Sequence, residues 1–226
     1  MIRYITAVLV LLAAGPARAF ELKDDAQLWT PAFINAPARG RLVGLLELQP
    51  RVRGDFQRLS TGIVRPWIGW RLAPATFVHA GYGWIRSDAA RVTTEHRAWQ
   101  QLQASMSPAS GWTVTGRARL EQRFLEAIPE TSWRARAMLR VERALSGGPK
   151  YAVAYNESFV NLNSPDRGPR SGFDQNRAFL GIGRDGPRAK VEGGYQHVWL
   201  RRPGARDAHV HCLVVNSWLW PWGRGG

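Results

Sequence analysis

The sequence predicts an all-β protein, namely an antiparallel up-and-down transmembrane β-barrel of 10–12 strands, with 12 favoured, preceded by a cleavable signal peptide. Three observations predict this class: long segments that alternate between polar and apolar residues, turn signals between the segments, and an export signal at the N-terminus. After that signal there is no helix-length apolar pattern. We therefore divide the chain into a signal peptide, 1–19, and a barrel domain, 20–226.

The N-terminal segment has the form of a secretory signal. Arg3 precedes an apolar run over 4–14, and Ala17-Arg18-Ala19 has the small-x-small form that signal peptidases cut. The run is well below the roughly 18 residues that a spanning helix needs. Cleavage after Ala19 leaves Phe20 as the first residue, and because Phe20 is not cysteine, we expect no lipid attachment there.

The alternation is clearest in the two segments of 112–141, which are joined by a short connection at 128–131. Arg119 and Glu121 share one face of an extended chain, and Leu120 and Gln122 share the other. The second segment repeats the pattern. Globular strands run about 5–6 residues, whereas these run to roughly 12, a length that suits a tilted strand crossing a bilayer.

The remaining strands follow from the same period of two. With the two central segments, the expected strands are 26–34, 41–53, 60–72, 77–86, 94–105, 151–162, 173–184, 190–200 and 208–220. Pro50 and Pro66 each remove one backbone donor and weaken the strand locally. These are 11 strands, and since bacterial barrels have an even number, we expect one further strand before Ser60.

The charge of the chain is strongly positive, with 31 basic and 17 acidic residues. We do not interpret it as nucleic-acid binding, because the arginines occupy alternate strand positions instead of a helix or a tail. We expect the arginines instead to line an interior or to contact anionic lipid head groups. The expected partners are therefore outer-membrane lipid and lipopolysaccharide. The single cysteine, Cys212, cannot form an intramolecular disulfide and is expected to be a small apolar residue in the last strand.

Alternation alone does not say which face points inward, since a soluble sandwich buries its apolar face and a membrane barrel exposes it. The signal, the strand length and aromatic residues near strand ends favour the barrel over a soluble periplasmic sandwich. The aromatic residues that suit interfacial girdles are Trp84, Trp112, Trp133, Trp199, Trp218 and Trp220.

Several short blocks, in this order, are similar to a known family: 27–30 (QLWT), 95–97 (EHR) through 99–102 (WQQL), 119–124 (RLEQRF), 156–161 (NESFVN) and 173–177 (FDQNR). Together they resemble the Domain of Unknown Function 2490 family of bacterial outer-membrane barrels. The resemblance implies export to the periplasm, insertion by the barrel-assembly machinery and a location in the Gram-negative outer membrane, and it implies no established activity. Such barrels usually end on an aromatic residue, whereas this chain continues past Trp220 to Gly226.

If the polar faces point inward, the interior holds a charged network. We expect its members to be Glu95, Arg97, Arg117, Arg119, Glu121, Arg123, Arg134, Arg136, Arg140, Glu142, Glu157, Arg177 and Glu192. The first interpretation is a structural plug in which arginines bridge carboxylates across neighbouring strands. The second is an anion-preferring passage, because arginines outnumber carboxylates.

The third interpretation is a lipid-modifying hydrolase, which needs a serine, a histidine and an orienting polar group within hydrogen-bond reach. Ser158 lies beside Glu157, but no Gly-x-Ser-x-Gly motif is present, so we assign no catalytic residue. His209 and His211 share one strand face, and two histidines without a third ligand do not define a metal site. We expect no cofactor and no metal.

Overall fold

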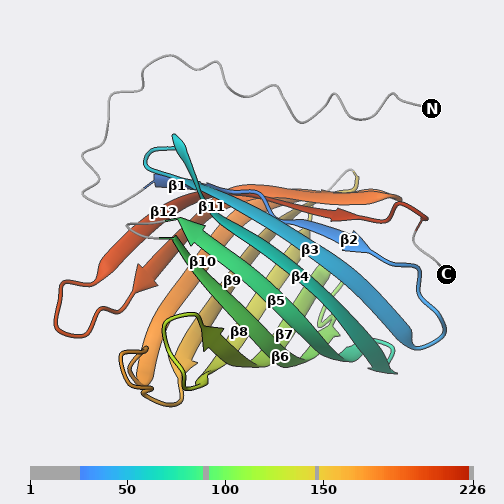
Figure 1. Cartoon of the computed structure of the whole chain (residues 1–226). Helices are drawn as coiled ribbons and strands as arrows, with labels where there is room; N and C mark the ends of the chain where they lie inside the picture. Colours follow the sequence, from blue (N-terminus) through green and yellow to red (C-terminus); the bar gives the residue numbers. More distant parts are fainter. Residues whose placement is uncertain (1–25, 89–91, 146–147, 224–226) are drawn as a thin grey trace.

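The computed structural model describes residues 26–88, 92–145 and 148–223, which form twelve strands and no helix (Figure 1). The strands are β1 (Ala26–Trp29), β2 (Ala32–Asn35), β3 (Leu42–Arg53), β4 (Arg58–Ala73), β5 (Thr76–Asp88), β6 (Val92–Met106), β7 (Trp112–Leu125), β8 (Ser132–Ala144), β9 (Lys150–Asn161), β10 (Gly172–Asp185), β11 (Ala189–Leu200) and β12 (Ala208–Leu219). Among the described residues, none belongs to a helix that could cross a membrane. The predicted signal peptide and its cleavage position lie outside this part of the chain.

All twelve strands belong to one sheet that closes on itself. From β3 to β12 each strand pairs antiparallel with the next, as expected for a meander of hairpins. The ring closes where β1 and β2 lie between β3 and β12, antiparallel to β3 and parallel to β12. The all-β barrel of twelve strands is therefore confirmed.

The seam differs from the even, uniformly antiparallel ring that we expected. β1 and β2 are two halves of the predicted 26–34 strand, interrupted at Thr30 and Pro31, because proline has no N–H for the sheet ladder. β1 and β2 follow one another along the same place in the ring, between β3 and β12, so the twelve strands occupy 11 positions around the barrel. In an up-and-down ring with an odd number of positions, one neighbouring pair must run in the same direction, and that pair is the parallel seam with β12.

The two ends of the barrel carry different connections. The connections 36–41, 74–75, 107–111 and 186–188 lie at what we call the turn end, where β12 also finishes. The connections 54–57, 126–131, 162–171 and 201–207 lie at the loop end, where β1 begins. The connections at the loop end include the two longest of these, 162–171 and 201–207.

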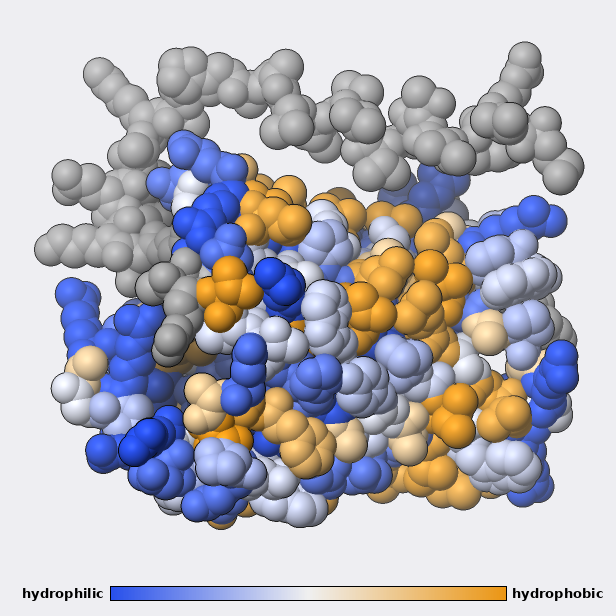
Figure 2. Space-filling view, viewed as in Figure 1, coloured by the Kyte–Doolittle hydropathy of each residue, from blue (hydrophilic) through white to orange (hydrophobic). Residues whose placement is uncertain are grey.

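The structure settles which face of each strand points inward. On β7, Arg119 and Glu121 are buried inside the barrel, whereas Phe124 is exposed on its outer wall. The same holds on β10, where Leu180 and Ile182 are 66% and 68% exposed. Figure 2 shows apolar side chains gathered over part of the outer surface. The outer wall thus exposes large apolar side chains while charged side chains are buried inside, the reverse of a soluble protein.

One side of the interior is apolar. Beneath β1 and β9 to β12, a buried cluster is formed by Trp29, Tyr151, Val153, Phe179, Val198, Val210, Cys212 and Val214. Inward-facing glycines make room for large rings: a Cβ on Gly81 would lie 2.3 Å from the Trp99 ring, and one on Gly183 would lie 2.2 Å from the Tyr151 ring of this cluster. The interior beneath these strands is therefore filled partly by apolar side chains, and charged residues such as Glu157 and Glu192 lie beside them.

Candidate functional site

Glu121, on β7, is the centre of the charged interior and has no exposed surface. One carboxylate oxygen accepts from Arg136 on β8 at 2.6 Å, and the other accepts from Arg134 at 2.7 Å. Arg119 and Arg97 lie 3.7 and 3.9 Å away. Four guanidinium groups thus surround one carboxylate, which places Glu121 among cations that would repel one another without it.

The same arginines connect Glu121 to further carboxylates. Arg136 also donates to Glu157 on β9 at 2.7 Å, and Glu157 accepts from Arg117 at 2.6 Å. Toward the loop end, Glu95 accepts from both Arg97 and Arg123 at 2.6 Å. We call this continuous set the Glu121 network; its members are Glu95, Arg97, Arg117, Arg119, Glu121, Arg123, Arg134, Arg136, Glu157 and Asp174.

A second cluster lies nearer the turn end. Glu192, on β11, has no exposed surface and accepts from Arg140 and from the Tyr151 hydroxyl, the latter at 2.7 Å. Glu142 accepts from Arg140 at 2.9 Å and from Lys190 at 3.0 Å. Each carboxylate here has a cation within reach, so the cluster joins β8, β9 and β11 through paired charges.

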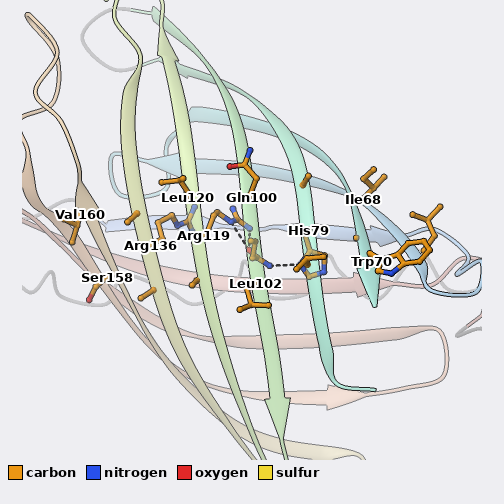
Figure 3. A pocket seen from close by; sticks show the side chains of 18 residues that line it. Ile68, Trp70, His79, Gln100, Leu102, Arg119, Leu120, Arg136, Ser158 and Val160 are labelled. Carbon is orange, nitrogen blue, oxygen red and sulfur yellow. Dashed lines mark hydrogen bonds between the residues drawn. The ribbon is translucent and has the colours of Figure 1, made fainter. Parts of the chain in front are cut away.

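The interior also contains a chain of hydrogen bonds that includes neutral groups. Arg119 donates to the Gln101 carbonyl oxygen at 2.6 Å, and the Gln101 amide nitrogen lies 3.2 Å from His79 Nδ1. Figure 3 shows these hydrogen bonds, which connect Arg119 on β7 to His79 on β5 through a side chain of β6. On the outer side of the barrel, Leu102 on β6 and Trp70 on β4 line a groove of about 960 Å³ that crosses the wall from β3 to β9.

A cavity of about 460 Å³ lies inside the barrel and extends from the turn end past the middle of the strands. It extends from Phe33 and Trp218, whose rings stack 5.0 Å apart, to Trp29 and Arg177 deeper in the barrel. Glu121 does not line this cavity. Five members of the Glu121 network, Arg97, Arg117, Arg119, Arg136 and Glu157, form part of the cavity wall, and the rest of the network fills the interior toward the loop end.

The structure places all thirteen residues of the predicted interior network on the inner face. Nine belong to the Glu121 network, and Arg140, Glu142 and Glu192 belong to the second cluster. Arg177 joins neither, because no carboxylate of the described residues lies within 4.0 Å of it.

Sequence reasoning missed several inward charges. Glu47 and Arg65 form a buried pair at 2.6 Å between β3 and β4, and Arg51 and Lys190 also line the cavity. The alternation that placed the other arginines inward applies to these positions as well. Asp174 had no such signal, because a register shift between Phe173 and Gln175 turns it inward to Arg134.

The serine considered for catalysis and the histidines considered for metal binding lie on the outer side of the barrel. Ser158 lies on the outer side, where its hydroxyl accepts from Asn176 at 2.9 Å, while Glu157 points inward. His209 and His211 lie on one face of β12, and the His197 ring on β11 lies 5.2 and 5.5 Å from theirs, with its Nε2 atom 3.0 Å from His209 Nδ1. Among the described residues, no group of three or more His, Cys, Asp and Glu is arranged to hold a metal ion.

Beyond the strands, one carboxylate at the loop end fastens the 201–207 connection. Asp207 accepts from the backbone N–H of Arg202 at 3.0 Å and from the Trp199 indole at 2.9 Å. These two hydrogen bonds lower the pKa of Asp207 below its ordinary value. The connection is therefore tied to the end of β11 by an ionised side chain.

Fold and interior together define a β-barrel protein with a charged, mostly paired interior and an apolar outer wall. The chain belongs to the family described as protein of unknown function (DUF2490), whose model matches residues 26–209. It is 32% identical to an uncharacterised protein of Methylorubrum extorquens over 222 residues, which cover 96% of this chain and 97% of the relative. No solved structure matches the chain.

Proposed function

We propose that this protein is a bacterial outer-membrane barrel whose interior is closed by the Glu121 network, and that it therefore forms no open pore. The observation that carries the proposal is the reversed polarity of the wall. Leu180, Ile182 and Leu139 are more than half exposed, whereas Glu121 and Glu192 have no exposed surface. Large exposed apolar side chains of this kind are unfavourable in water and favourable in lipid.

Aromatic side chains on the outer wall support the same location. Trp133, Trp199 and Phe124 are exposed near the loop end, and Trp70 and Trp112 are exposed near the turn end. Aromatic rings prefer the two interfaces of a bilayer, where an apolar ring and a polar edge are both accommodated. The two sets therefore mark the upper and lower limits of an embedded band.

The lengths of the connections support an orientation. Bacterial barrels have short turns toward the periplasm and longer loops outside. The turn end, with connections such as 74–75 and 186–188, would then face the periplasm, and the loop end, with 162–171 and 201–207, would face outward. In this orientation the interior cavity opens toward the periplasmic side.

Conductance distinguishes a closed barrel from a passage. Protein refolded into a planar bilayer should give no steady current steps, because Glu121 and the arginines around it fill the interior. Folding in the same preparation is checked by circular dichroism and by resistance to protease. Steady anion-selective steps from folded protein would contradict closure and would favour an arginine-lined passage instead.

A further inference from the structure

The cavity inside the barrel has more cations on its wall than the carboxylates can pair. Nine arginine and lysine side chains line it, against three glutamates, Glu47, Glu142 and Glu157. Glu95, Glu121 and Glu192 do not line the cavity but pair with some of these cations. When they are added to the three lining glutamates, nine cations still face six carboxylates. The excess creates a positive potential inside a low-dielectric enclosure, where it attracts anions strongly.

The excess is concentrated on two arginines that lie against one ring. Arg51 has its guanidinium carbon 3.6 Å from the centre of the Trp29 ring, and Arg177 has its own 5.1 Å away. Among the described residues, neither has a carboxylate within 4.0 Å. Glu157 is the register partner of Arg177, but it already accepts from Arg117 and Arg136.

Several donors around the cavity have no acceptor in the protein. The Nε atoms of Arg51 and Arg177 are buried without a hydrogen-bond partner, as are Arg119 Nη1 and Gln196 Nε2. Arg119 and Gln196 are 8% and 2% exposed, and both line the same cavity. A buried donor without an acceptor is destabilising. The side chains that carry these four donors all line one space, where a ligand with acceptor oxygens would give them partners once they turn toward it.

The shape and the rim of the cavity indicate what kind of anion fits. Planar guanidinium groups bind phosphate and carboxylate oxygens in pairs of hydrogen bonds. Phe33 and Trp218 stack at the turn end of the cavity, and Trp67 and Trp220 line it as well. An oxyanion group at Arg51 and Arg177 would lie beside Trp29, with its apolar or aromatic body directed along the cavity toward these rings.

We propose that the cavity is a binding site for a small organic oxyanion, a phosphate monoester or a carboxylate, held by Arg51 and Arg177 against Trp29. The two arginines supply the charge and the donors, and the aromatic rim supplies contact for the rest of the molecule. Binding to this chamber requires neither conductance nor a particular membrane, so its failure is distinguishable from failure of the closed-barrel proposal.

The test uses the full mature protein refolded in a neutral detergent at low chloride. Phenyl phosphate, benzoate and inorganic phosphate are each titrated by calorimetry, and the unfolding temperature is measured with and without each anion. We expect phenyl phosphate or benzoate to bind and to raise the unfolding temperature, since a ligand that binds only the folded state stabilises it. Inorganic phosphate, which lacks an apolar body, should bind more weakly.

Arg51→Met and Arg177→Met should each weaken binding by about tenfold or more, since a charge-assisted hydrogen bond contributes about 1.5–3 kcal/mol. Arg167→Met, at an exposed position in 162–171, is the control and should leave binding unchanged. Without anion, Arg177→Met should unfold no earlier than the unmodified protein, because it removes a cation that has no carboxylate partner.

Two results would overturn the proposal. The first is that the folded, unmodified protein binds none of the three anions. The second is that Arg177→Met unfolds at a much lower temperature while any anion binding persists, because Arg177 would then serve the fold alone. A preference for benzoate over phenyl phosphate, or the reverse, would assign the class of oxyanion.

Discussion

Glu121→Gln is expected to destabilise the folded barrel by about 3–5 kcal/mol, the usual effect of removing one partner from a buried ionic group. Glutamine keeps the shape of the side chain and removes its charge. Arg134 and Arg136, which lie 2.7 and 2.6 Å from this carboxylate, would then face each other in the buried interior without it. Arg97 and Arg119 would lose the same neighbour.

The measurement for Glu121→Gln is denaturant unfolding in detergent micelles, with near-ultraviolet circular dichroism as the signal. Glu130→Gln is the matched control, because Glu130 is an exposed carboxylate in the 126–131 connection. That variant should stay within about 0.5 kcal/mol of the unmodified protein. If the two variants unfold alike, the Glu121 network does not stabilise the barrel in the way described here.

Leu180→Arg is expected to destabilise the protein in lipid by about 2–4 kcal/mol, the cost of an arginine facing the middle of a bilayer. Leu180 lies at the middle of β10, points outward and is 66% exposed. If water covered this wall, the same substitution at so exposed a position would change stability by only about 0.5 kcal/mol in either direction. The two environments therefore predict clearly different results.

For Leu180→Arg, unfolding is measured after insertion into phospholipid vesicles. Leu162→Arg is the control, since Leu162 is 52% exposed and lies in the 162–171 connection, outside the strands. The control should lose little stability. Equal losses in both variants, or no loss in either, would argue against a lipid-facing wall at β10.

The strands could be predicted from the sequence because the period of two persists over long segments, as in β7 and β8. The seam was not. β1 and β2 are short, and their partners on β12 lie at the other end of the chain, so no local pattern reports that Trp29 pairs with Val214. Pro31 lies inside the predicted 26–34 strand, where it separates β1 from β2, and the pairing of both halves with β12 depends on the closed ring.

The sequence predicted which charged residues lie inside the barrel, but it did not predict which of them contact one another. Alternation identified Arg119, Glu121 and Arg136 as sharing one face with other charged residues. Which arginine pairs with which carboxylate depends on strand register and on the reach of long side chains across the barrel. Arg177 illustrates this limit, because its register partner Glu157 is engaged by Arg117 and Arg136 instead.

The central claim is that this barrel is an integral protein of the outer membrane, and cell fractionation tests it most directly. The protein would be produced with its own N-terminal segment in a Gram-negative host, and the membranes separated by density and washed at alkaline pH. We predict that it sediments with the lipopolysaccharide-containing fraction and stays there after the wash. Recovery of folded protein in the soluble periplasmic extract would contradict the account.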